Sequence, residues 1–112
     1  MRYAIPVNGG MLAAHFGHCE GFSVFDVDDD SHEILSREFV PSPGHAPGVL
    51  PAFLAEQGVS AVVAGGMGSR AVSLFEENRI EVYLGAPEGD AEDIIAAFIE
   101  GTLEAGENVC DH

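Results

Sequence analysis

The second half of the chain alternates short apolar segments with helical patterns, and this alternation constrains the fold most. Residues 60–64 (SAVVA) and 80–84 (IEVYL) are apolar segments of strand length, and each is followed by a segment whose apolar residues recur at helical spacing. A third helical pattern lies between Pro47 and Gly58. Strands that alternate with helices pair in parallel through right-handed crossovers. The sequence therefore predicts an α/β fold.

The first half adds antiparallel strands to this sheet. Residues 3–7 (YAIPV) predict a buried strand, and residues 21–27 and 33–39 predict a β-hairpin around an acidic turn. Residues 8–20 contain three glycines and are expected to form a long loop. Ser69 and Asp90 are expected to cap the last two helices. The resulting fold class is α/β, with a mixed five-stranded sheet and three helices distributed over both faces.

The length of 112 residues allows one domain. We expect residues 1–102 to form a single α/β domain and residues 103–112 to form a flexible tail. No apolar run reaches the roughly 18 residues of a membrane-spanning helix, and the N-terminus lacks the pattern of a signal peptide. These features predict a cytoplasmic protein, in which two cysteines far apart in sequence are thiols or metal ligands rather than a disulfide.

The charge balance excludes two classes of partner. Four basic residues face 19 acidic residues, which gives a formal net charge of −15. Nucleic-acid binders need basic side chains to displace phosphate counterions, and anionic membrane surfaces also attract basic segments. We therefore expect neither nucleic acid nor membrane as a partner.

Soft metal ligands are concentrated in residues 14–20 (AHFGHCE), where His15, His18 and Cys19 lie within five residues. Imidazole nitrogen and cysteine sulfur are ligands for zinc, iron, copper and iron–sulfur species. The spacing matches no standard zinc finger. The alternative is a polar loop in which His15 caps backbone carbonyls and Cys19 is a small core residue.

The segment Gly65-Gly66-Met67-Gly68 follows a strand and opens a helix. Backbone N–H groups in such a turn can bind an anion, assisted by the helix dipole. The segment lacks the P-loop Lys-Ser/Thr pair and the spacing of a dinucleotide fingerprint. Its alternative role is a tight turn in which glycine is needed sterically. Arg70, one of four basic residues, is expected to be exposed near any bound anion.

Topology predicts that these two segments converge. Open α/β sheets bind ligands beyond the carboxyl ends of their parallel strands. The 8–20 loop and the 65–68 turn both leave such ends, so they meet if the two strands are adjacent. We expect an anionic metal–sulfide cluster there, and we expect the carboxylates to lie elsewhere.

Other candidates are less specific. His45 is a possible ligand or a histidine bonded to backbone, and Cys110 and His112 are possible ligands on a tail that is otherwise disordered. His32 is expected to be exposed at the hairpin turn. No catalytic constellation is evident, although a nucleophilic Cys19 activated by His15 or His18 is an alternative.

Four segments resemble the dinitrogenase iron–molybdenum cofactor biosynthesis family of small cluster-binding proteins. They are HFGHCEGFSVFDVD (15–28), PSPGHAPGVLPAFLAEQGV (41–59), VVAGGMGSRAVSLFEENRIEVYLGA (62–86) and GTLEAGENVCDH (101–112). The resemblance implies a ribonuclease H-like motif without nuclease chemistry. It also implies a site that contains His15, Phe16 and Gly17 of the HFG motif together with the GGMG turn, with His18 and Cys19 as additional ligands. His45, Cys110 and His112 match only a subgroup.

The resemblance favours a non-enzymatic carrier or scaffold for an iron–sulfur or iron–molybdenum-type cluster or its precursor, which exchanges this cargo with donor and acceptor proteins. The alternative is a mononuclear metal-binding or regulatory protein that holds a single transition metal ion such as zinc through His18, Cys19, Cys110 and His112.

Overall fold

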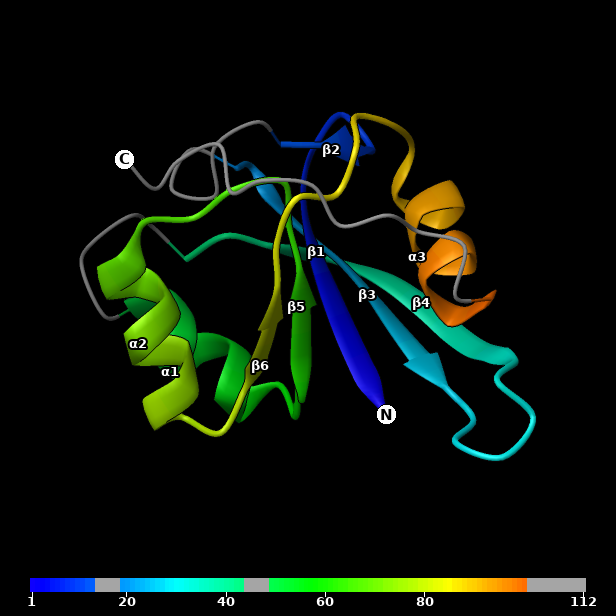
Figure 1. Cartoon of the computed structure of the whole chain (residues 1–112), viewed down its shortest axis with the longest axis horizontal. Coiled ribbons are helices and arrows are strands. Elements are labelled where there is room, and N and C mark those ends of the chain that lie inside the picture. The colour runs from blue at the N-terminus through cyan, green and yellow to red at the C-terminus, as the bar shows by residue number, and fades with distance from the viewer. Residues whose placement is uncertain (14–18, 44–48, 101–112) are drawn as a thin grey trace.

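The computed structural model describes residues 1–13, 19–43 and 49–100, and Figure 1 shows the arrangement of their helices and strands. The strands, in chain order, are β1 (Arg2–Asn8), β2 (Met11–Leu12), β3 (Gly21–Val27), β4 (Ile34–Pro41), β5 (Ala61–Val63) and β6 (Glu81–Tyr83). The helices are α1 (Val49–Glu56), α2 (Ser69–Glu77) and α3 (Ala91–Glu100).

Five strands form one continuous mixed sheet in the order β4-β3-β1-β5-β6. β1 pairs in parallel with β5, which pairs in parallel with β6, while β3 is antiparallel to both β1 and β4. This arrangement confirms the predicted parallel half and the predicted hairpin. β2 is a sixth strand that pairs with the end of β1, and its Met11 also forms an isolated bridge with Asp90. The expectation of loop throughout residues 8–20 is therefore wrong at Met11 and Leu12.

The sheet separates two apolar layers, as expected for helices on both faces. α1 and α2 cover one face and α3 covers the other (Figure 1). Between the sheet and α1 and α2 lie large buried side chains that include Phe22, Leu54 and Phe75. The α3 side buries Phe25 and Ile95. Alternate residues of a strand point to opposite faces, which explains why Phe22 and Phe25 belong to different layers.

The two predicted helix caps have different outcomes. Asp90 caps α3, because its Oδ1 accepts a hydrogen bond of 2.9 Å from the backbone N–H of Glu92. Ser69 instead is the first residue of α2, and the cap position is taken by Gly68. Glycine has no side chain with which to accept hydrogen bonds from the first turn, and this difference matters for the candidate site.

Candidate functional site

The sheet order brings the end of β1 next to the end of β5. The two strands pair in parallel at Tyr3 with Ala61 and at Ala4 with Val62. A methyl group built on Gly65 would lie 3.4 Å from Leu12 Cδ2, so the segment after β1 packs against the turn after β5. The predicted convergence is therefore confirmed for the described parts of both segments.

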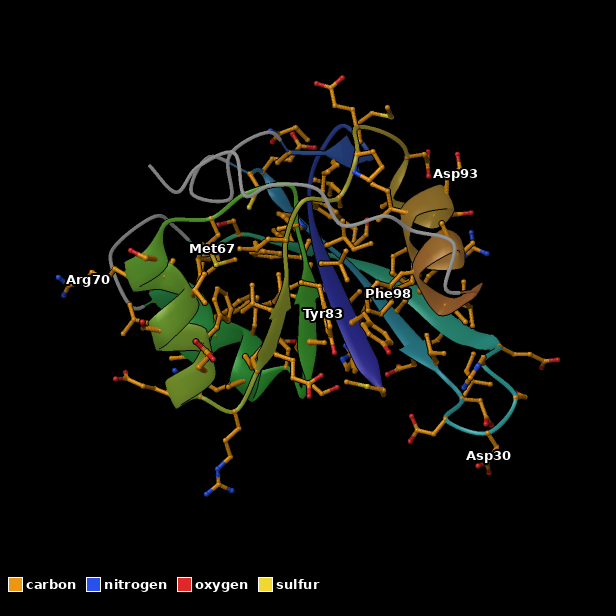
Figure 2. The ribbon with its side chains drawn as sticks, in the orientation of Figure 1. Asp30, Met67, Arg70, Tyr83, Asp93 and Phe98 are labelled. Carbon is orange, nitrogen blue, oxygen red and sulfur yellow. The ribbon has the colours of Figure 1, made fainter. Side chains whose placement is uncertain are left out.

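Backbone hydrogen bonds fix the start of the 65–68 turn. Gly85 N–H donates to the Gly65 carbonyl at 3.0 Å, and Ala86 N–H donates to the Ala64 carbonyl at 3.1 Å. The Met67 side chain is 1% exposed and lies in the layer beneath α1 and α2. Figure 2 shows it pointing inward at the start of α2. The turn is thus held by neighbouring backbone on one side and by a buried thioether on the other.

Gly68 lies in open space at the start of α2. Its φ of −63° and ψ of 149° are accessible to any residue, and a Cβ built on it would meet no heavy atom within 4 Å. The first N–H groups of a helix have no partner within the helix, and Gly68 offers them no side-chain acceptor. This end of α2 can therefore receive a negatively charged group directly on the backbone.

Backbone strain does not explain the glycines at 65 and 68. Among the described residues, the glycines with positive φ are Gly9, Gly10, Gly58 and Gly85. At Gly65 an added Cβ would make ordinary contacts, at 3.4 Å with Leu12 and 3.5 Å with the Ala86 carbonyl. The alternative that the turn needs glycine for steric reasons therefore does not hold at Gly68. There the absence of a side chain instead leaves the backbone accessible.

Cys19 is part of the core on the same side of the sheet. Its side chain is 2% exposed and lies in the layer that also contains Met67. Burial raises the pKa of the Cys19 thiol to about 11, against the smaller lowering effect of backbone hydrogen bonds at Cys19 and Gly21. A cysteine nucleophile needs a depressed pKa. The structure therefore gives no support to the enzyme alternative centred on Cys19.

Arg70 is exposed on the first turn of α2, as expected. Figure 2 shows its side chain extending away from the sheet into solvent. In this position it contributes positive charge near the start of the helix.

Several predicted site residues lie outside the described residues: His15, Phe16, Gly17, His18, His45, Cys110 and His112. Within residues 1–13, 19–43 and 49–100, no group of three His, Cys, Asp or Glu side chains could hold a metal ion. A ligand set of that size would have to draw on residues outside these ranges.

Some carboxylates lie near the candidate site, at the end of the sheet where β1 and β5 finish, and others do not. The turn from Asp28 to Asp30 follows β3 and lies at the opposite end of the sheet, because β3 is antiparallel to β1. Asp30 is labelled there in Figure 2. Glu20, however, lies beside Gly9, and Asp90 pairs with Met11. The expectation that carboxylates lie elsewhere is wrong for these two residues, although each carboxylate accepts a hydrogen bond from a backbone N–H.

Asn8 and Glu20 are two residues that the sequence analysis did not single out. Glu20 N–H donates to Asn8 Oδ1 at 2.7 Å, and Gly9 N–H donates to Glu20 Oε1 at 2.9 Å. These bonds join the two ends of the segment between β1 and β3. The available signal was position alone, since each polar residue lies at a strand boundary.

Comparison with known proteins identifies the family of this chain. A sequence model of the family described as "Dinitrogenase iron-molybdenum cofactor" matches residues 1–101. The chain belongs to this family. The match includes Cys19 and the 65–68 turn but not Cys110 or His112, so the proposed role of these two residues gains no support from it.

Similar proteins match the chain over almost its whole length. The MJ0580 protein of Methanocaldococcus jannaschii is 32% identical over 109 residues, which is 93% of this chain and 90% of that protein. The crystal structure of PH0822 has a TM-score of 0.85 and 33% identity, covering 95% of this chain and 96% of that one. The apo form of the orange protein from Desulfovibrio gigas shares the fold, with a TM-score of 0.71, 23% identity and coverage of 96% and 93%.

The fold therefore matches the α/β architecture of solved proteins along nearly their full lengths. The family connects the chain with handling of the iron–molybdenum cofactor. In the part of the chain that the structure describes, no helix has the length and apolar character needed to cross a membrane.

Proposed function

We propose that this chain is a non-enzymatic carrier or scaffold for an iron–sulfur or iron–molybdenum-type cluster or its precursor. The cluster is cargo, received from a donor protein and passed to an acceptor protein in the cytoplasm. Family membership supports the class of cargo. The observation that carries the proposal is the open, uncapped start of α2 at Gly68, in the same turn as Gly65, which packs against Leu12 of the segment that leaves β1.

The residues divide into two proposed roles. The N–H groups of the 65–68 turn and the first turn of α2 bind the negative charge of the cluster, with Arg70 nearby. His15, His18 and Cys19 supply soft ligands to the metal, next to Phe16 and Gly17. His45, Cys110 and His112 are additional proposed ligands.

Cys19 needs a particular condition to act as a ligand. Its pKa of about 11 keeps the thiol protonated at neutral pH. A coordinating metal ion supplies enough positive charge to deprotonate a thiol, so binding would release a proton. We therefore propose that cargo binding by Cys19 proceeds at neutral pH.

The test compares a double variant of two proposed ligands with a control variant of a histidine outside the site. The full-length chain is reconstituted anaerobically with iron, sulfide and molybdate, desalted, and assayed for metal, acid-labile sulfide and visible absorption. His15→Asn with Cys19→Ala should lose the charge-transfer bands, whereas His32→Asn should keep them because His32 is exposed at the opposite edge of the sheet. Undiminished binding in the double variant would refute the ligand assignment. Sulfide-independent binding of one zinc ion per chain would favour the mononuclear alternative.

A further inference from the structure

The segment between β1 and β3 is anchored at both of its described ends. At one end, Ala13 N–H donates to the Pro6 carbonyl at 2.9 Å. At the other, Glu20 N–H donates to Asn8 Oδ1 and also to the Val7 carbonyl, at 2.7 and 3.1 Å. Ser42 N–H donates to the Glu20 carbonyl at 3.1 Å. Glu20 is therefore a junction that touches the end of β1, the start of β3 and the chain after β4.

The Asn8 and Glu20 bonds are reciprocal. Each side chain accepts a hydrogen bond from the backbone at the opposite end of the segment, with Asn8 Oδ1 facing Glu20 N–H and Glu20 Oε1 facing Gly9 N–H. Glu20 is exposed and contributes nothing to the apolar core. The Glu20 side chain therefore joins the two ends of the segment and does not pack in the core.

This closure acts on Cys19, which precedes Glu20 directly. The Cys19 side chain leaves the exposed junction and enters the buried layer that contains Met67 of the 65–68 turn. Backbone hydrogen bonds from Glu20 N–H to the Val7 carbonyl and from Ser42 N–H to the Glu20 carbonyl also hold this junction, and the Glu20 side chain adds the bond from Gly9 N–H. Precise placement of a binding group reduces the ordering that binding would otherwise require.

We propose that Asn8 and Glu20 form a positioning clip that holds Cys19 in the buried layer that also contains Met67 of the 65–68 turn. The proposal rests on the proposed function of that site, because it assigns the clip to cargo retention. Asn8 and Glu20 are positioning residues and do not touch the cargo. The negative charge of Glu20 is incidental to this role, since an uncharged acceptor of the same shape would also close the clip.

The first experiment measures the cargo dissociation rate after anaerobic reconstitution of full-length variants. Glu20→Ala and Asn8→Ala should each speed dissociation about three- to tenfold, the effect of losing one hydrogen bond. Glu20→Gln should stay within about twofold of the wild type, because its amide oxygen can accept from Gly9 N–H. Ser36→Ala is the matched control: it removes a side-chain hydrogen bond of 2.8 Å to Asp26 on the β3–β4 hairpin, and it should leave dissociation unchanged.

Two outcomes would overturn the clip. Faster dissociation in Ser36→Ala would make the effect one of general stability. Slower dissociation in both Glu20→Gln and Glu20→Ala would show that Glu20 acts through its charge, by repelling the cargo.

A second experiment tests the clip without cargo, so its failure is distinguishable from failure of the proposed function. Alkylation at Cys19, followed by peptide mass spectrometry in the empty protein, should accelerate about three- to tenfold in Glu20→Ala and Asn8→Ala. Glu20→Gln and Ser36→Ala should match the wild type. If the wild type takes up no cluster but this pattern holds, the clip stands and the proposed function fails. Equal alkylation in all variants overturns the clip.

Discussion

At the scale of single residues, Gly68 is a position where the fold does not require glycine but binding of an anionic ligand would benefit from it. The sequence predicted Ser69 as the helix cap, which would have satisfied the first turn of α2 internally. The structure places Gly68 there, without strain and with open space in front of it. Sequence reasoning missed this because serine is a strong cap former, and the actual boundary of the helix is one residue away from it.

Gly68→Ser should stabilise the fold and weaken cargo binding at once. A serine at the cap position supplies an oxygen to the first N–H groups of α2, which adds a few tenths of a kcal/mol to the free energy of unfolding. The same oxygen occupies the N–H groups that an anionic cluster would use. Urea unfolding measures the first effect, and sulfide retention after reconstitution measures the second.

Gly89→Ser is the matched control for this substitution. Gly89 also has open space at its Cβ position and no positive φ, and it precedes the cap of α3. It should leave cargo retention unchanged. Full retention in Gly68→Ser would rule out the start of α2 as the anion site.

The buried thiol of Cys19 predicts a pH dependence of stability. Its pKa rises from a value of 9.0 to about 11 on folding. Between these two pH values the unfolded chain loses the Cys19 proton while the folded chain keeps it, so the free energy of unfolding falls as pH rises. Chemical denaturation from pH 8 to 11 should show this fall, and Cys19→Ala should show a smaller one. An identical pH profile in Cys19→Ala would mean that other groups cause it.

At the scale of elements, periodicity located all three helices and five of the six strands. The hairpin of β3 and β4 follows from alternating apolar residues, and its first strand has the predicted bounds, Gly21–Val27. β2 was missed because two residues show no period. Besides pairing with β1, it contacts distant residues: Leu12 N–H donates to the Gly89 carbonyl at 2.9 Å, and Met11 pairs with Asp90.

Phe98 of α3 contacts aromatic side chains of two strands, β1 and β6. The Phe98 ring lies edge-to-face with Tyr3 at 5.4 Å and with Tyr83 at 4.8 Å between ring centroids. Tyr83 and Phe98 are labelled in Figure 2. Phe98→Ala should lower the free energy of unfolding by about 2–3 kcal/mol, toward the low end for phenylalanine truncation because Phe98 is only partly buried.

Phe39→Ala provides the matched comparison in urea unfolding. Phe39 is 52% exposed on β4, so its truncation should cost about 1 kcal/mol or less. Equal losses in the two variants would show that the Tyr3–Phe98–Tyr83 contacts add little to the attachment of α3.

At the scale of the whole molecule, parallel pairing was predictable, whereas the strand order and the placement of charge were not. Alternating strands and helices imply right-handed parallel connections, but the sequence left open whether the first strand and the strand at residues 60–64 are adjacent, and the structure shows that β1 and β5 are neighbours. The positions of Glu20 and Asp90 near the candidate site could not be predicted, because they follow from tertiary contacts: Glu20 bonds with Asn8 and Gly9, and Asp90 pairs with Met11 of β2.

The net charge of −15 predicts a marked salt dependence of folding. Like charges repel one another in the compact state, and salt screens that repulsion. Raising the sodium chloride concentration from about 10 mM to 150 mM, where the screening length falls from roughly 30 to 8 Å, should raise Tm. A Tm that is constant or lower in salt would show that the four ion pairs among the described residues outweigh the repulsion.

The most direct test of the central claim is the metal and acid-labile sulfide content of the wild-type chain after anaerobic reconstitution, with and without added sulfide. A carrier of a metal–sulfur cluster should retain metal and sulfide in fixed proportion through desalting, with charge-transfer absorption that appears only when sulfide is supplied. Retention of a single metal ion regardless of sulfide, or of no metal in either condition, would contradict the account.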